Sequence, residues 1–104
     1  MKTTQVTLTD GQQYDLGFDF AVICDYEELF GEEFTTRLLT KQTTQLRVIY
    51  AAVHAFNEGV PEWRQFRHLS VEDVVTLSNA IAPHLNSFYH IPADTPAGED
   101  DGNP

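Results

Sequence analysis

Apolar residues are densest in the stretch 46–56, LRVIYAAVHAF. They recur at steps of three and four residues, the spacing that lines one face of an α-helix, at Leu46, Ile49, Tyr50, Val53 and Phe56. Thr43 or Thr44 can cap the start of this helix, and the segment 57–61, NEGVP, predicts its end. Since so apolar a helix must be largely covered, we predict that the remaining elements pack around it.

Residues 3–18 predict a β-hairpin, because apolar and polar positions alternate on both sides of a turn signal. A two-residue turn at Asp10-Gly11 would place the apolar sets of the two strands on opposite faces of the hairpin. A three-residue loop, 9–11, with Gly11 in the left-handed region, instead places Val6 opposite Tyr14. We therefore predict the three-residue loop.

Residues 18–30 predict a helix of about three turns. Asp19 can cap its start, and Gly31 lies just past its end. Its expected apolar stripe is Val22, Tyr26, Leu29 and Phe30. The threonine-rich segment 32–43 predicts a connector with room for one helical turn.

Two further helices are expected after the central one. In the segment 60–69, Pro61 is suited to be the first helical residue. Ser70 and the acids after it predict the start of a last helix, with an apolar face at Val74, Leu77, Ile81, Leu85 and Phe88. Pro83 cannot donate to the carbonyl of Asn79, so this helix should kink or be reset there.

The segment 93–104, ADTPAGEDDGNP, has no large apolar side chain and is expected to be disordered. The predicted fold class is α+β, mainly α. An N-terminal β-hairpin is followed by three to four helices around one small core. The folded domain would span 1–92, with a disordered acidic C-terminal tail over 93–104.

Composition narrows the range of partners. A chain of 104 residues with 41% hydrophobic content fits one domain with one modest core. The single Cys24 cannot form an internal disulfide, which is typical of a reduced, cytosolic protein. The net charge of −10, from 16 acidic and 6 basic side chains, repels phosphate backbones and anionic membranes. We expect neither nucleic acid nor a membrane as a direct partner.

The sequence contains only weak signals for a catalytic or metal-binding site. The four histidines form no pair spaced by three or four residues within one expected helix. The acids between Asp25 and Glu33 are better explained as a solvated helix face, because a catalytic pair needs one desolvated partner. No serine or cysteine has the local context of a nucleophile, and there is no glycine-rich phosphate loop. We expect no enzymatic activity, no metal and no cofactor.

One segment, 61–68, collects aromatic and basic residues on this acidic chain. Because tryptophan and arginine are enriched at binding hot spots, we take as candidates for partner contact Trp63, Arg64, Phe66 and Arg67. The alternative, which we favour over this one, is that Trp63 and Phe66 cover the core while the arginines neutralise nearby acids.

The order of these motifs resembles the tail assembly chaperones of long-tailed bacteriophages and related prophages. The hairpin has V-x-L, a glycine turn and Y-x-L-x-F-x-F, and the following helix ends with YEELFG at 26–31. A Tyr-Ala-Ala helix at 50–52, an S-V-E-D-V helix start at Ser70 and an acidic end complete the match. The segment 61–68 is less acidic than the resemblance implies.

The resemblance implies a non-enzymatic morphogenesis factor in the cytoplasm of a bacterial host, absent from the finished virion. Its partner would be the tape measure protein, a long helical, aggregation-prone chain that is kept soluble while tail tube subunits assemble around it. The tail tube protein is a further candidate partner, and a homo-oligomer is compatible with this role. Many such proteins also have a longer, frameshifted form. The alternative function is a small phage or bacterial adaptor or regulatory protein that binds one folded partner.

Overall fold

An antiparallel β-hairpin precedes four helices in the computed structural model, which describes residues 3–35 and 40–89. The elements are β1 (Thr4–Thr7), β2 (Gln13–Leu16), α1 (Phe20–Phe30), α2 (Gln42–Phe56), α3 (Trp63–Phe66) and α4 (Val71–Tyr89). The predicted fold class, a mainly α arrangement behind an N-terminal hairpin, is therefore confirmed. The expectation of a disordered tail over 93–104 lies outside the described residues.

The hairpin has the predicted register. Val6 pairs with Tyr14, and both side chains are buried. The Leu8 N–H donates to the Gln12 carbonyl at 2.8 Å, and the Gly11 N–H donates to the Leu8 carbonyl at 2.9 Å. Gly11 has φ of +90°, so the three-residue loop with a left-handed glycine is confirmed.

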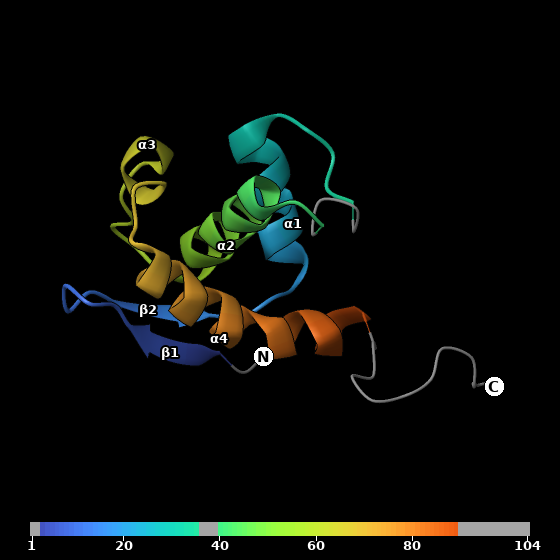
Figure 1. Ribbon diagram of the computed structural model, residues 1–104. Helices are drawn as coiled ribbons and strands as arrows, with labels where there is room; N and C mark the ends of the chain where they lie inside the picture. The colour runs from blue at the N-terminus through green and yellow to red at the C-terminus, as the bar shows by residue number, and fades with distance from the viewer. Residues whose placement is uncertain (1–2, 36–39, 90–104) are drawn as a thin grey trace.

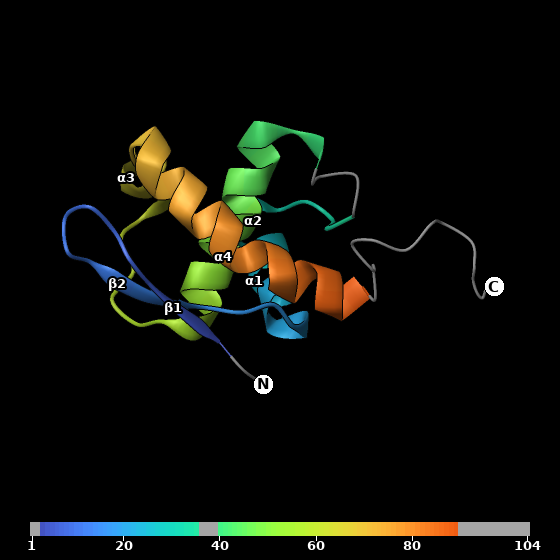
Figure 2. The same ribbon diagram turned by 60° about the horizontal axis from the view of Figure 1, so that its bottom comes forward.

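Helix α2 is the centre of the fold, as predicted. It packs against α1, β2 and α4, and α4 also contacts both strands of the hairpin. Figure 1 shows α4 between α2 and the hairpin, and Figure 2 shows α4 crossing in front of α2. The six consecutive residues 48–53 of α2 are buried, with Ala51, Ala52 and Val53 fully inaccessible. The two alanines allow neighbouring elements to approach α2 closely.

The start of α2 was predicted wrongly. The helix begins at Gln42, one turn before Leu46, and neither Thr43 nor Thr44 caps it. Lys41 occupies the cap position without a side-chain hydrogen bond, and the Thr44 hydroxyl donates back to the Lys41 carbonyl at 3.3 Å. Because threonine can satisfy its hydroxyl on the preceding turn, it is accepted inside the helix and does not mark the start.

Most predicted helix ends are confirmed. The Asp19 carboxylate accepts from the Ala21 N–H, and Gly31 ends α1 in the left-handed region with φ of +66°. The Ser70 hydroxyl accepts from the Asp73 N–H at 3.2 Å and caps α4. Helix α2 ends at Phe56, where the Asn57 side-chain amide donates to the Val53 carbonyl.

Two details of the predicted apolar stripe and of α3 are wrong. Leu29 is 40% exposed, because the buried face of α1 is centred on Tyr26 and turns toward the partly buried Ile23 and Phe30. Pro61 is not the first residue of a helix. Its carbonyl instead accepts a 2.6 Å hydrogen bond from the Tyr50 hydroxyl, and α3 starts two residues later at Trp63.

Helix α4 passes through Pro83 without being reset. Proline removes the hydrogen bond that would reach the Asn79 carbonyl. Both Pro83 and Asn79 lie on the exposed side of the helix, so water can satisfy this carbonyl and the break costs less than in a buried position.

Two polar side chains fasten the hairpin to the helices. The buried Asp73 carboxylate accepts from the Thr9 N–H and from the Thr9 hydroxyl, each at 2.9 Å. The Asn57 amide bonds both the N–H and the carbonyl of Asp15 in β2, at 2.9 and 2.8 Å. These contacts fix α4 and the end of α2 relative to the hairpin.

Candidate functional site

The four residues predicted to contact a partner do not share one surface. Phe66 is only 2% exposed, and its ring lies 4.9 Å from that of Tyr50. Trp63 is partly buried against the rings of Phe30, at 5.2 Å, and Tyr50, at 5.5 Å. Phe66 therefore belongs to the core and is not available to a partner in this fold.

The two arginines of this segment are exposed. Neither Arg64 nor Arg67 forms an ion pair with another residue that the structure describes. The expected neutralisation of nearby acids is therefore not found for them within 3–35 and 40–89. Arg64 and Arg67, with the partly exposed Trp63, stay a predicted partner surface.

Several acids between Asp25 and Glu33, and His54, form contacts with other parts of the fold. Asp25 of α1 pairs with His54 of α2 at 2.8 Å, and Glu32 pairs with Arg47 at 2.9 Å. The Glu27 carboxylate accepts from the Phe34 N–H at 3.0 Å and holds the chain after α1. Among the described residues, no group of three or more histidine, cysteine or acidic side chains could hold a metal ion. The Asp25–His54 pair joins α1 to α2, and the Glu32–Arg47 pair joins the segment after α1 to α2.

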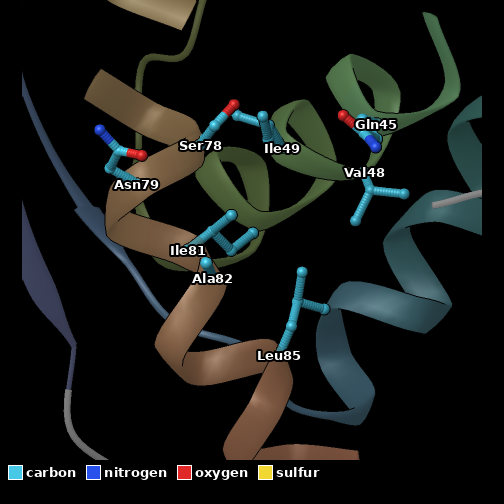
Figure 3. Close-up of a pocket in the computed structure, with 8 residues that line it drawn as sticks. All are labelled: Gln45, Val48, Ile49, Ser78, Asn79, Ile81, Ala82 and Leu85. Atoms are coloured by element: carbon cyan, nitrogen blue, oxygen red, sulfur yellow. The ribbon is translucent and has the colours of Figure 1, made fainter. Parts of the chain in front are cut away.

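A groove lies between α2 and α4, apart from a larger, polar hollow of about 620 Å³ beside Arg47 and Glu32. The groove has a volume of about 360 Å³, and its lining residues are Gln45, Val48, Ile49, Ser78, Asn79, Ile81, Ala82 and Leu85. In Figure 3, Ile81 and Leu85 from α4 and Val48 from α2 point toward the space between the two helices. None of the eight side chains carries a charge. We call this feature the α2–α4 groove.

The groove has an apolar floor and a mixed rim. Val48, Ile49 and Ile81 are at most 3% exposed, so they form its floor. Gln45, Asn79 and Ala82 are exposed, and Ser78 is half-buried, so small and amide side chains form the rim. A partner placed here would meet apolar atoms at the bottom and uncharged hydrogen-bonding groups at the edge.

Helix α4 carries a second apolar stripe that continues from this groove. Val71 is 80% exposed and Val75 is 49% exposed, although both are large apolar residues. With the groove residues of α4 they follow alternating steps of four and three, at Val71, Val75, Ser78, Ala82 and Leu85. This spacing places them on one side of a helix. We call these five residues the outer face of α4.

Helix α4 carries no charged side chain after Asp73. The sixteen residues from Val74 to Tyr89 include no aspartate, glutamate, lysine or arginine, in a protein whose charged content is 21%. Depletion of charge around exposed apolar side chains is a feature of the centres of protein interfaces. The outer face and the α2–α4 groove together form the candidate functional site.

The sequence reasoning assigned α4 a single apolar face and so missed this site. Leu77 and Ile81 lie on the face that was predicted, and both are buried. Two signals could have revealed the second face. One is the series of four- and three-residue steps that runs from Val71 to Ala82 and meets the predicted face at Leu85, and the other is the uncharged run after Asp73.

Comparison of the chain with protein-family models, with curated proteins and with solved structures found no match. No helix in the described ranges is both long and apolar enough to cross a membrane. Function must therefore be argued from the residues of this chain.

Proposed function

We propose that this protein is a non-enzymatic phage tail assembly chaperone that binds the tape measure protein and keeps it soluble during tail tube assembly. The observation that carries the proposal is the uncharged outer face of α4 beside an open apolar groove, on a protein of net charge −10. The ordered series of motifs from Val6 to Ser70, which resembles such chaperones, supports the tape measure protein as the partner.

Such a role is physically reasonable because the protein has an uncharged apolar groove and an acidic remainder of the surface. A long helical chain that has not yet been covered by tube subunits exposes apolar stripes, which associate with one another in water. A groove between two helices can cover such a stripe by helix-in-groove packing. The acidic remainder of the surface then gives the complex a high net charge, which opposes further association.

The proposal places the protein in the host cytoplasm during assembly and leaves it out of the finished virion. The tail tube protein is a second partner that the same role would require at the moment of transfer. No nucleotide, metal or other cofactor takes part, since binding by apolar contact needs none.

Co-expression with the tape measure protein of the same phage tests the proposal. We expect the tape measure protein to remain in the soluble fraction and to co-purify with the wild-type chain without ATP. A small control protein of equal negative charge should leave it insoluble, which separates specific binding from an effect of charge. Equal precipitation of the tape measure protein with and without the wild-type chain would refute the proposal. An adaptor that binds one folded partner would be compatible with that result.

A further inference from the structure

We infer that the outer edge of strand β1 pairs with β1 of a second copy of this chain, so that two hairpins form one four-stranded antiparallel sheet. This edge shares no residue with the α2–α4 groove, and its pairing does not depend on the proposed function. Three features point to it: the direction of the backbone groups of β1, the closure of the other edge positions of the hairpin, and the side chains of β1.

The backbone groups of β1 alternate in direction, and the hairpin register shows which of them face outward. The Leu8 N–H donates to the Gln12 carbonyl at 2.8 Å, so the even-numbered residues of β1 point their N–H and carbonyl groups toward β2. The odd-numbered residues Gln5 and Thr7 therefore point theirs away from β2. Both residues are exposed, and no hydrogen bond from another described residue reaches these outward backbone groups.

The fold closes the neighbouring edge positions and leaves this one open. On the far side of the hairpin, the Asn57 amide binds both the N–H and the carbonyl of Asp15, as a neighbouring strand would. At the turn, the Asp73 carboxylate accepts from the outward N–H of Thr9. The sheet of the described chain has only two strands, and in Figure 1 no other labelled element lies beneath β1. An open edge with unpaired backbone groups is a template for another strand.

The sequence of this edge contains none of the usual obstacles to pairing. Proteins commonly guard an open edge with charged side chains, with proline or with a bulge. Residues 3–9, TTQVTLT, include no charged residue, no proline and no glycine, and five of the seven are β-branched. The register is continuous from Thr4 to Thr7, so this stretch has no bulge. The strand at the edge therefore has the composition of a strand with neighbours on both sides.

The side chains of β1 fit β1 of a second copy. Within the hairpin, Gln13 lies opposite Thr7, and its amide donates to the Thr7 hydroxyl at 3.4 Å. Two antiparallel copies related by a twofold axis at Val6 place Gln5 of one copy opposite Thr7 of the other. This arrangement repeats the glutamine–threonine pair on the same exposed face of the sheet. A second copy supplies the matching residues by symmetry, whereas a foreign strand must carry them independently.

Charge does not oppose this pairing at the edge. Lys2 precedes the uncharged segment 3–9 and Asp10 follows it, so antiparallel copies bring ends of opposite charge together. The only acid of the two strands is Asp15 in β2, and three strand spacings, about 14 Å, separate it from Asp15 of the second copy. This separation exceeds the Debye length of about 8 Å at physiological salt, so repulsion between the two sheets is largely screened.

A dimer of this kind carries two α2–α4 grooves. The use of both grooves on one tape measure chain rests on the proposed function. Binding of the second groove would then be intramolecular, which raises the overall affinity without any new contact.

Amide hydrogen exchange of the isotope-labelled full chain, followed by NMR, tests the pairing without any variant. It is measured at about 50 µM and at about 1 mM protein, because dimerisation depends on protein concentration. We expect the Gln5 and Thr7 amides to exchange at least about tenfold more slowly at the higher concentration. The Gln13 amide also points away from the hairpin, but from β2, and should exchange equally at both concentrations.

Two proline variants localise the interface. Gln5→Pro removes an outward N–H from β1, and Gln13→Pro removes an outward N–H from β2, so neither change takes a hydrogen bond from the hairpin ladder. Dimerisation of each variant and of the wild type is measured by sedimentation velocity. We expect Gln5→Pro to weaken the dimer by about tenfold or more and Gln13→Pro to change it by less than about twofold. Circular dichroism checks that both variants keep the fold.

Four results would overturn the inference. They are a monomer at the higher concentration, a dimer in which the Gln5 and Thr7 amides exchange no more slowly, equal weakening by both variants, and slowed exchange only after the tape measure protein is added. In the last case the edge would take a foreign strand.

The measurements on the chain alone are independent of the co-expression test. If the chain dimerises through β1 while the tape measure protein precipitates, the proposed function fails and the β1 interface stands. If the tape measure protein is kept soluble by a chain that stays monomeric, the interface fails and the proposed function stands.

Discussion

The Tyr26 hydroxyl offers a sharp test of how the core is held together. It is buried, and no residue that the structure describes accepts or donates a hydrogen bond of normal geometry there, although the Glu32 and Arg47 side chains lie near enough to influence its pKa. The ring packs well, with centroids 5.2 Å from Phe30 and 5.5 Å from Phe34. A buried hydroxyl without a partner loses hydration worth about 1–3 kcal/mol. Tyr26→Phe removes this atom and keeps the ring, so we expect it to raise the free energy of unfolding by about 1 kcal/mol.

Tyr50→Phe is the matched control, because it deletes the same atom from another core tyrosine. The Tyr50 hydroxyl donates to the Pro61 carbonyl at 2.6 Å and holds the segment before α3. Its removal leaves that carbonyl without its partner and should lower the free energy of unfolding by about 1–2 kcal/mol. The same chemical change is thus expected to have opposite signs at two sites in one core.

Urea denaturation followed by circular dichroism measures both effects, and thermal melting provides a second readout. For a domain of this size, 1 kcal/mol corresponds to a shift of about 4–8 °C in the melting temperature. A loss of stability in Tyr26→Phe as large as that in Tyr50→Phe would refute the reasoning. It would show that the Tyr26 hydroxyl donates a hydrogen bond in solution.

Three further predictions follow from buried groups. Asp73→Ala removes the acceptor of both Thr9 hydrogen bonds and should lower the free energy of unfolding by about 2–3 kcal/mol in urea denaturation. A loss of less than about 0.5 kcal/mol would mean that the two Asp73–Thr9 hydrogen bonds are not formed. Ile49→Ala should cost about 2–4 kcal/mol, since the side chain is 3% exposed, and a loss below about 1 kcal/mol would contradict its place in the core. Stability should also fall as the pH is raised from 8 to 11, because above about pH 10 the unfolded chain releases phenol protons that the folded chain retains. The urea midpoint at the two pH values checks this, and an unchanged midpoint would contradict the raised pKa that burial gives to Tyr14, Tyr26, Tyr50 and Tyr89.

The parts of the fold that could be predicted depend on local rules. The hairpin register follows from Val6 and Tyr14 alone, since a shift by one residue would move one of them to the other face. Asp19, Gly31 and Ser70 mark helix ends through contacts with neighbours one turn away. Such signals are contained in a few consecutive residues and need no knowledge of the tertiary structure.

The parts that could not be predicted depend on contacts between distant segments. The place where α3 starts is set by the Tyr50 hydroxyl, eleven residues before the Pro61 carbonyl that it binds. Trp63 and Phe66 are residue types that are common in binding surfaces. In the fold, however, Trp63 packs against the ring of Phe30 and Phe66 packs against the ring of Tyr50. The α2–α4 groove is likewise invisible in either helix alone, because its two walls come from different helices.

Site-specific photo-crosslinking tests the central claim most directly, namely that the tape measure protein binds on the outer face of α4. A photoreactive phenylalanine derivative is placed at Ser78 in one version of the chain and at Ser87 in the other, which lies two and a half turns further along α4 and so on its opposite side. Each version is produced in cells together with the tape measure protein and is irradiated. The account predicts a crosslinked product with the tape measure protein from position 78 and little or none from position 87. Crosslinking from position 87 without crosslinking from position 78 would contradict it.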